Sequence, residues 1–425
     1  MSDLPLFTSP FAELQRRGRY AIVELRAPAL VLSTCHVNGG LRNDLRYLVN
    51  HQSCEPGKHL ERHELIAEIG QNGYHRHVCA ELALDPAQTA LMGTAAQMQY
   101  LGMITQTHAD LSVTAIVTAG VTGNAGSAGD AAHYDERNGK WERVMPPQIP
   151  TVKTQTPKIE SVPNEIAGSP NQKSEIPNQK SPGTHHGTIN TVLLFSAPLS
   201  AAALTRAAMT MTEAKTSALL ELAVGSKSSW RLATGTGTDQ FAIATPLHGG
   251  APRTWTGKHT KAGELTGLAV RQATLEALRW QNGLEPSLTR SLFHALGRFG
   301  LTEEAFKAAQ PTLLSEREFE LLKANWNPVV YEPQLAAAAY AFAAVLDRVL
   351  YGTLGAGSAR ESLINQAALM AAGLACQPER FDNFRRELIP HLPLDLGSAP
   401  AQLLPAAVAL AQRAIALGWR KKWNQ

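Results

Sequence analysis

Four segments of this chain, three of which contain glycine, carry side chains that can take part in acyl or proton transfer. A glycine-rich loop after a buried strand exposes backbone N–H groups and lets a large ligand come close, which suits an oxyanion hole or an amide-rimmed substrate. One such loop alone is more simply a tight turn, but two in comparable positions favour a shared site. The segments are 38–41, 117–121 followed by Asn124 and Asp130, 212–216, and 233–239.

One lysine falls on the apolar face of an expected helix over residues 199–222. At about 100° per residue the apolar side chains form one stripe, and Lys215 lies in the middle of it. An ammonium group aimed into an apolar face is costly unless it meets a carboxylate or takes part in proton transfer. The alternative is that it snorkels out from the end of the stripe. We expect Lys215 to meet Asp239 or Asp130. The stripe consists of Leu204, Ala208, Met211, Ala218 and Leu222.

Two further titratable side chains have competing explanations. Glu213 is two residues from Lys215 and so faces nearly the opposite side of the helix, which rules out a local ion pair between them. If Glu213 is exposed, a surface charge explains it more simply than catalysis. His259 precedes an expected helix and could protonate a leaving amine or donate to a substrate, or it could only pack where that helix begins.

The elements that would position these residues alternate between strand and helix. Each half of the N-terminal region has a helix, then a strand, then a glycine–threonine loop. This order predicts a mixed α/β (α+β) catalytic domain in two half-repeats, with a mixed sheet, flanking helices and loops gathered on one edge. The expected strands cover 29–34, 112–119 and 191–195, with a strand pair over 230–245, and the expected helices cover 89–107, 199–222 and 263–280.

The composition of the chain changes sharply at two places. Residues 146–186 are rich in Pro, Gln, Lys, Ser and Thr and contain Pro-Asn-Gln-Lys-Ser twice. They can bury too little to offset the entropy of ordering, so we predict a disordered insert. It interrupts one catalytic domain made of residues 1–145 and 187–287. Alanine- and leucine-rich helical patterns dominate residues 288–425, which predicts a helical accessory domain for packing or homo-oligomerisation.

Together with Gly-Thr-Ile-Asn-Thr at 187–191 and Lys-His-Thr at 258–260, the four segments resemble the adenosylcobinamide amidohydrolase family. The resemblance covers residues 20–282 apart from the insert, so the insert and the C-terminal helices depart from the family pattern. It implies a hydrolase of corrinoid salvage and cobamide remodelling. Such an enzyme cuts the amide that joins aminopropanol to a corrin propionate of adenosylcobinamide and releases adenosylcobyric acid. The corrinoid is then the substrate, and no cofactor is expected.

Amide hydrolysis gives the expected catalytic residues their roles. The reaction needs an activated attacker, an oxyanion site and a proton for the departing amine. We expect Asp239 or Glu213 to activate either water or Thr236, and the choice of attacker stays open. Lys215 would hold the oxyanion, and His259 would supply the proton.

Loop residues would hold the corrinoid itself. The backbone amides of the 233–239 loop would share the oxyanion with Lys215, and the remaining loop residues would line the cleft. A non-catalytic corrinoid-binding or chaperone protein on the same scaffold is the alternative, although the sequence lacks the base-off motif Asp-x-His-x-x-Gly. The expected binding residues are Asn38, Gly39, Gly40, Asn124, Asp130, Gly235, Gly237 and Thr238.

Histidine and cysteine spacing does not predict a metal site. The histidine pairs lack a convergent third ligand, and His-Glu-x-x-His is absent. The cysteines form no Cys-x-x-Cys pair, which argues against a disulfide framework or a zinc knuckle. The pairs are His59 with His63, His75 with His77 and His185 with His186, and the cysteines are Cys35, Cys54, Cys79 and Cys376.

Charge and hydropathy exclude several other classes of protein. A net charge of +3 over 425 residues is too small to favour nucleic acid as a partner. The apolar run at 335–346 is shorter than the roughly 20 residues of a membrane span, so no span is expected. The first ten residues lack the pattern of a secretory signal, which leads us to expect a cytoplasmic protein.

Overall fold

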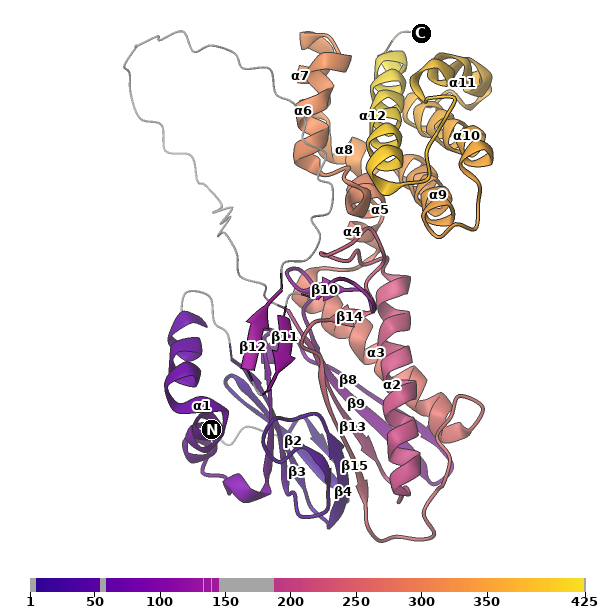
Figure 1. Cartoon of the computed structure of the whole chain (residues 1–425). Coiled ribbons are helices and arrows are strands. Elements are labelled where there is room, and N and C mark those ends of the chain that lie inside the picture. The colour runs from indigo at the N-terminus through magenta and orange to yellow at the C-terminus, as the bar shows by residue number, and fades with distance from the viewer. Residues whose placement is uncertain (1–4, 54–58, 133, 139, 145–186, 424–425) are drawn as a thin grey trace.

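Two β-sheets form the N-terminal part of the protein in a computed structural model that describes residues 5–53, 59–132, 134–138, 140–144 and 187–423 (Figure 1). The first sheet has the order β1-β2-β3-β6-β7. Its strands pair antiparallel except β6 and β7, which are parallel and are connected through α1. The bounds are β1 Phe7–Thr8, β2 Ala12–Arg17, β3 Tyr20–Leu25, β6 Tyr47–Gln52, α1 His59–Leu82 and β7 Thr89–Thr94.

The second sheet has the order β5-β4-β15-β13-β9-β8. Here β13 and β15 are the parallel pair, and the other neighbours are antiparallel. Helices α2 and α3 cover one face of this sheet. The bounds are β4 Ala29–Ser33, β5 Gly40–Arg42, β8 Gly102–His108, β9 Leu111–Ala119, β13 Ile189–Phe195, α2 Ala201–Glu221, β15 Gln240–Pro246 and α3 Lys261–Asn282.

Strand β13 is buried on both sides because its side chains alternate between two cores. Leu193 packs with the residues of α2 and α3. Val192 and Leu194 point the other way and pack between the two sheets, together with Leu48 and Met92 of the first sheet. A polar contact also crosses this second core, where the buried Asn190 donates to the side chain of Asn50 at 2.9 Å.

The expected fold class is confirmed: a mixed α/β region with flanking helices is followed by a helical region. The expected strands at 29–34, 112–119 and 191–195 and the helices at 199–222 and 263–280 are present within two residues at each end. Each half of the α/β region contains a parallel strand pair joined by a helix, β6–α1–β7 and β13–α2–β15.

The expected helix over 89–107 is wrong. This segment forms β7, the short 3₁₀ turn η2 (Met98–Tyr100) and β8. Burial alternates along the second half of β7, and Gly102 begins β8 where α3 crosses it. A Cβ on Gly102 would lie 2.1 Å from the carbonyl oxygen of Ala273, so the crossing itself requires glycine. The number of apolar residues in this segment agrees with a helix, but packing against α3 requires strands here.

The expected strand pair over 230–245 is also wrong in its pairing. The short strand β14 (Gly235–Thr236) pairs with β10 (Ala125–Gly126), while β15 pairs with β13 and β4. The chain therefore passes from a separate two-stranded sheet at β14 into the second sheet at β15. The insert at 146–186 lies outside the described residues, after the hairpin of β11 (Tyr134–Arg137) and β12 (Lys140–Arg143).

The C-terminal helices have a core of their own. Arg298 connects them to the α/β region, because its guanidinium forms two 2.7 Å hydrogen bonds with Asp347 and a third with the carbonyl oxygen of Trp230. The expected limits of the three domains stay predictions. The helices are α4 Pro286–Thr289, α5 Leu292–Leu296, α6 Glu303–Leu313, α7 Glu316–Ala324, α8 Trp326–Val330, α9 Pro333–Leu350, α10 Ala356–Ala375, α11 Phe381–Leu388 and α12 Pro400–Trp423.

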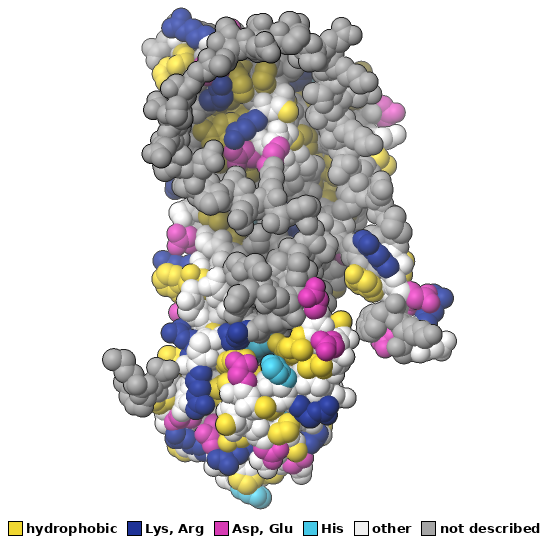
Figure 2. Space-filling view, turned by 90° about the vertical axis from the view of Figure 1, so that its left-hand side faces the viewer, with side chains coloured by type: hydrophobic (Ala, Val, Ile, Leu, Met, Phe, Trp, Pro, Cys, Tyr) yellow, Lys and Arg dark blue, Asp and Glu magenta, His cyan; other side chains and the backbone are white. Residues whose placement is uncertain are grey.

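Two surface features bear on possible partners. Helix α12 is long and apolar enough to cross a membrane by length and composition, but 61% of its most apolar window is buried inside the helical core, which a core helix explains. On the part of the face in Figure 2 that belongs to the α/β region, Lys and Arg side chains lie interspersed with Asp and Glu. The described residues of this face therefore form no extended patch of one charge.

The crossing of β8 and α3 gives a prediction about stability. Replacing Gly102 with Ala should lower the free energy of unfolding by about 2–4 kcal/mol, because the new Cβ displaces helix backbone. Gly267→Ala in α3 is the matched control, because a Cβ there meets nothing within 4 Å and should raise stability by up to about 1 kcal/mol. Urea unfolding measures the free energy of unfolding of both variants. Equal changes in the two variants would contradict a close approach of β8 and α3 at Gly102.

Candidate active site

The loops that carry the predicted site residues begin at one edge of the second sheet. In the antiparallel pairs, Ala119 at the end of β9 lies opposite Ile189 at the start of β13, and Ser33 at the end of β4 lies opposite Ala242. The chain after β4, the chain after β9 and the turn before β15 therefore lie at the same edge. The expectation that the loops gather on one edge is confirmed.

The two glycine-rich loops pair directly with each other at this edge. Ala125 lies opposite Thr236, and Gly126 lies opposite Gly235. The hydroxyl of Thr234 adds a link, since it accepts a 2.8 Å hydrogen bond from the N–H of Ala128. The loops thus form one surface, as the sequence predicted for a shared site.

The side chain of Asp239 lies at the centre of this surface. One oxygen, Oδ2, accepts from the Lys215 ammonium and from the Thr236 N–H at 3.1 Å. The other, Oδ1, accepts from the Thr236 hydroxyl at 2.5 Å and from the Ile189 N–H at 2.9 Å. Four donors complement the charge of a carboxylate whose side chain is only 17% exposed. Asp239 therefore joins α2, the start of β13 and the second glycine loop.

Lys215 points inward, as the helical stripe predicted. Its side chain is 12% exposed, and Asp239 is its partner rather than Asp130, the other expected carboxylate. The ammonium has three N–H donors, of which one donates a hydrogen bond to Asp239. The other two can donate to a bound group. A buried ammonium beside a carboxylate supplies a fixed positive charge and also holds that carboxylate in position.

Gly235 makes room for this ion pair. A Cβ built on Gly235 would lie 2.5 Å from Oδ2 of Asp239 and 3.0 Å from Nζ of Lys215. Its φ angle is not positive, so the requirement is space rather than backbone conformation. The glycine in this position of the Gly-Thr-Gly-Thr run is therefore explained by the close approach of two charged side chains.

Asn124, Gly187 and Thr238 form the rim next to the Asp239 carboxylate. The amide of Asn124 donates to the carbonyl oxygen of Gly187 at 3.0 Å and to the Thr238 hydroxyl at 3.3 Å. Gly237 lies below this amide, since a Cβ there would lie 3.2 Å from Oδ1 of Asn124. Of these residues, Asn124, Gly237 and Thr238 were expected to bind substrate, and they lie beside the Asp239 cluster.

Asp130 is held farther along the first glycine loop. Its carboxylate accepts from the Ser127 N–H at 2.7 Å and from the Ser226 hydroxyl at 2.6 Å. Desolvation acts to raise the pKa of Asp130, but hydrogen bonds from Ser226, Ser229 and Ser127 outweigh it and lower the pKa. Asp130 is thus an ionised anchor for the loop, and no described contact joins it to Lys215.

The turn with Asn38, Gly39 and Gly40 lies at the same edge but faces away from Asp239. The amide of Asn38 donates to the carbonyl oxygens of Pro86 and Thr89, both at 2.8 Å, before and at the start of β7. Gly39 is required because a Cβ would lie 2.0 Å from the carbonyl oxygen of Cys35. These contacts give Asn38 and Gly39 a structural role in the turn.

Glu213 and His259 lie apart from the Asp239 cluster. Glu213 is 53% exposed and forms a 2.7 Å ion pair with the exposed Lys258. His259 is exposed, and no hydrogen bond or ion pair of the described residues joins it to Asp239. The condition under which Glu213 is more simply a surface charge is therefore met.

Comparison with models of protein families identifies the family of this chain. The model described as adenosylcobinamide amidohydrolase matches residues 8–286, which is well over half of the chain. The chain belongs to the adenosylcobinamide amidohydrolase family. It is thus an amidohydrolase of corrinoid salvage, and the match spans both sheets, α2 and α3 and ends where the C-terminal helices begin.

One relative of this amidohydrolase comes from Methanocaldococcus jannaschii. It is named only as uncharacterized protein MJ1613, and the two chains are 32% identical over 214 residues, which cover 50% of this chain and 71% of the relative. The membership in an amidohydrolase family, rather than this likeness, favours an enzyme over the non-catalytic alternative.

Two contacts of the amidohydrolase site were missed by sequence reasoning. The N–H of Ile189 binds Asp239, and the Thr188 hydroxyl donates to the carbonyl oxygen of Thr238 at 2.7 Å. Both residues belong to the 187–191 run, which the sequence marked but to which it gave no role. The signal that could have pointed to them is Thr188, a buried polar residue directly before the fully buried strand β13.

Metal ligands do not cluster in the part of the amidohydrolase that the structure describes, where no three His, Cys, Asp or Glu side chains converge. His75 binds the carbonyl oxygen of Thr89 at 3.0 Å. The side chains of His59 and His63, and all of residues 185–186, lie outside the described part. The expectation that no metal is needed stays a prediction.

The space left by Gly235 can be tested in the amidohydrolase. We expect Gly235→Ala to lower the rate of aminopropanol release from adenosylcobinamide by about 100-fold, because the Cβ would push Lys215 and Asp239 apart. Gly126→Ala is the matched control, since Gly126 lies opposite Gly235 and its Cβ would meet only Asp130 Oδ2 at 3.9 Å. Equal rates for the two variants would show that the space at Gly235 is irrelevant.

Proposed function

We propose that Thr236, Asp239 and Lys215 form the hydrolytic centre that cleaves the aminopropanol amide of adenosylcobinamide. The observation that carries this proposal is the 2.5 Å hydrogen bond from the Thr236 hydroxyl to Oδ1 of Asp239. A hydroxyl held by a carboxylate that is itself fixed by other donors is arranged to lose its proton to that carboxylate. Thr236 is half-buried at the edge of the glycine loop, where a substrate carbonyl can approach.

In the first step, Oγ1 of Thr236 attacks the amide carbonyl carbon and its proton passes to Asp239. The C–O bond forms, and the carbonyl electron pair moves to oxygen. The proton on Asp239 then passes to the amide nitrogen, the C–N bond breaks, and 1-amino-2-propanol leaves. The corrinoid remains as an ester on Thr236. Water attacks that ester by the same route and releases adenosylcobyric acid with Thr236 restored.

The negative oxygen of the intermediate would be held by Lys215 and by the backbone of the glycine loop. Lys215 has two ammonium N–H groups besides the one that donates a hydrogen bond to Asp239. Among the described residues, no group accepts a hydrogen bond from the N–H of Gly237, which is exposed at the rim. A fixed ammonium and a free N–H in a partly water-excluded site stabilise a developing oxyanion.

This arrangement gives no step to Glu213 or His259. Both side chains face solvent, and Glu213 is engaged by Lys258. The proton that the departing amine needs is the one that Asp239 received from Thr236, so a second acid is unnecessary. The roles that the sequence predicted for Glu213 and His259 are thus replaced in this proposal by Asp239 alone.

Corrinoid binding would use the rim beside this centre. Asn124 and Thr238 present an amide and a hydroxyl next to the Thr236 hydroxyl. We also propose that the enzyme acts in the cytoplasm, requires no resident cofactor and associates through its helical region. These three points rest on the sequence.

Substitutions at Thr236 test the attacker. We expect Thr236→Ala to lower aminopropanol release about 1,000-fold, because the attacking oxygen is gone, whereas Thr236→Ser keeps that oxygen and most of the activity. Acid quenching of the wild-type reaction should leave corrinoid colour covalently bound to the denatured protein. Near wild-type turnover by Thr236→Ala would contradict the threonine pathway and favour water activated by Asp239.

Two surface substitutions serve as controls for this series. Glu213→Gln and His259→Asn should retain turnover within about threefold, because neither side chain contacts the Asp239 cluster. Asp239→Asn should fall as far as Thr236→Ala. A large loss in His259→Asn, with folding unchanged, would restore the histidine as the proton donor.

Removal of metal ions is a separate test. The Lys215 ammonium occupies the position beside Asp239 where a divalent cation would have to bind, so we expect turnover to be unchanged after dialysis against a chelator. The measurement is aminopropanol release before and after dialysis, with a metal add-back. A loss of more than tenfold that one divalent metal restores would show that a metal takes part.

A further inference from the structure

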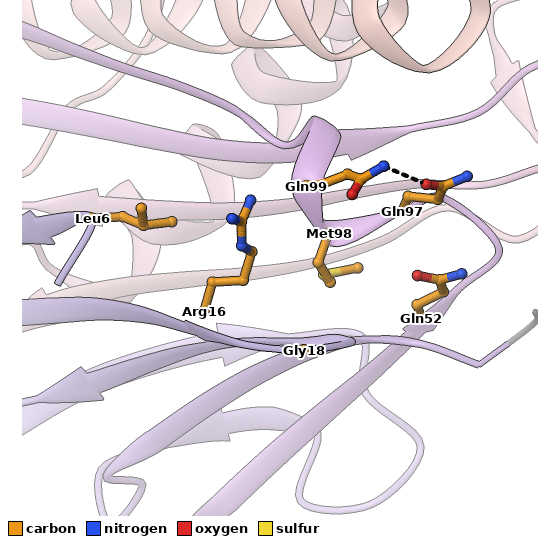
Figure 3. Close-up of a pocket in the computed structure, with 7 residues that line it drawn as sticks. All are labelled: Leu6, Arg16, Gly18, Gln52, Gln97, Met98 and Gln99. Atoms are coloured by element: carbon orange, nitrogen blue, oxygen red, sulfur yellow. Dashed lines mark hydrogen bonds between the residues drawn. The ribbon is translucent and has the colours of Figure 1, made fainter. Parts of the chain in front are cut away.

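A cavity of about 410 Å³ lies between the two sheets, outside the catalytic cluster (Figure 3). Arg16 near the end of β2 and Gly18 in the turn after it line the cavity, together with Gln52 at the end of β6. The 3₁₀ turn η2 and the residue before it contribute Gln99 and Gln97. Arg16 and Gln52 rise from the first sheet, and the η2 residues come down from the opposite side. All of the lining residues lie between Leu6 and Gln99, so the cavity belongs to the first half of the α/β region.

Hydrogen-bonding groups of the carboxamide type dominate this lining. Gln99 donates to the side-chain oxygen of Gln97 at 2.7 Å, and among the described residues the NH₂ of Gln97 and the amide oxygen of Gln99 have no partner. The Arg16 guanidinium likewise makes no hydrogen bond or ion pair within the described part of the chain. Met98 and Leu6 add apolar surface. The lining thus offers donors and acceptors but no anionic group.

Short contacts connect the cavity to the catalytic cluster. The N–H of Gln97 donates to Gln281 at 2.9 Å, and Gln281 together with Ala96 packs against Gly120. Gly120 lies next to Gly187, whose carbonyl oxygen accepts the hydrogen bond from Asn124. A second link runs from β7, where the Gly93 N–H donates to Gln240, the neighbour of Asp239, at 3.1 Å. The cavity and the cluster therefore lie at the same end of the strands.

We propose that this cavity binds peripheral carboxamide side chains of the corrinoid while the aminopropanol amide lies at Asp239. The inference rests on the function proposed above. The corrin periphery carries acetamide and propionamide groups, and each offers one acceptor and two donor protons, which match the open groups of Gln97, Gln99 and Arg16. Met98 and Leu6 face the methylene carbons of these arms.

The size of the cavity agrees with a subsite rather than the whole binding site. Its 410 Å³ is near the lower end of the roughly 300–1,000 Å³ found for sites of drug-sized ligands, and adenosylcobinamide is larger than such ligands. The macrocycle would lie over Asn124 and Thr238, which are accessible at the rim, with one side over Thr236 and the other over η2. Recognition of several amide arms at once would fix which amide reaches Asp239.

The test measures binding of the reaction product, adenosylcobyric acid, which has no aminopropanol amide left to cleave. Gln99→Leu and Arg16→Met should each weaken product binding in equilibrium dialysis about tenfold, as expected for the loss of one or two hydrogen bonds. Both side chains are exposed, so folding should be retained. The kcat for adenosylcobinamide should stay within twofold of wild type while KM rises.

Gln15→Leu is the matched control. Gln15 precedes Arg16 on β2, so it points to the opposite face of the strand, and it does not line the cavity. It should leave product binding unchanged. Unchanged binding in both Gln99→Leu and Arg16→Met would overturn the proposal.

Two ligand variants identify what the cavity holds. With adenosylcobyrinic acid, which has carboxylates in place of the amide arms, the effect of Gln99→Leu should disappear. With cyanide in place of the adenosyl group, the effect of Gln99→Leu should persist, and its loss would mean that the cavity takes the nucleoside, which also overturns the proposal. Failure of the catalytic proposal would give a different result from failure of the cavity proposal. In that case Thr236→Ala would still turn over substrate, while product binding would still depend on Gln99.

Discussion

The structure of the site is arranged around one half-buried carboxylate that accepts four hydrogen bonds. Asp239 can be buried only because an ammonium from α2, a backbone N–H from the start of β13 and two groups of its own turn meet it. Removing one of these donors would leave a largely buried charge with less compensation, which lowers the stability of the folded site. Asp239 therefore links three features to one another: the rotation of α2 about its axis, the position of the start of β13 and the conformation of the 235–239 turn. The absence of a side chain at Gly235 is the steric part of the same constraint.

The relation between the two sheets is fixed by a polar contact in an otherwise apolar core. Asn190 of β13 donates to Asn50 of β6 and to the carbonyl oxygen of Gly93 in β7, and Asn50 donates to Thr118 of β9. Hydrogen bonds have directions, whereas apolar packing tolerates sliding. These contacts hold the ends of β6 and β7 beside the starts of β13 and β15. The glutamine-lined cavity and the Asp239 cluster are consequently connected through hydrogen-bonded strand ends.

Sequence reasoning found the ion pair of the site but not the way the loops join. The position of Lys215 in an apolar stripe was sufficient to predict a carboxylate partner, because helical periodicity is local and a buried ammonium requires a carboxylate. It left open whether that partner is Asp239 or Asp130. The pairing of β10 with β14 joins residues more than 100 positions apart, and two-residue strands have no pattern of their own. The 89–107 segment was taken for a helix because its need for glycine at 102 comes from a helix 170 residues later. That error also concealed the cavity, two of whose glutamines lie in this segment.

The hydrogen bonds of Arg298 have a thermodynamic consequence for the loop between α2 and β14. This guanidinium joins the C-terminal helices to the carbonyl oxygen of Trp230, while Ser226 of the same loop binds Asp130 in the first glycine loop. Trp230 also packs on Tyr351, with ring centroids 5.1 Å apart. Local unfolding of the helical region would therefore release the loop from one side and lower the free energy needed to open it. The C-terminal helices thus contact a loop that also holds Asp130, although the family match ends where those helices begin.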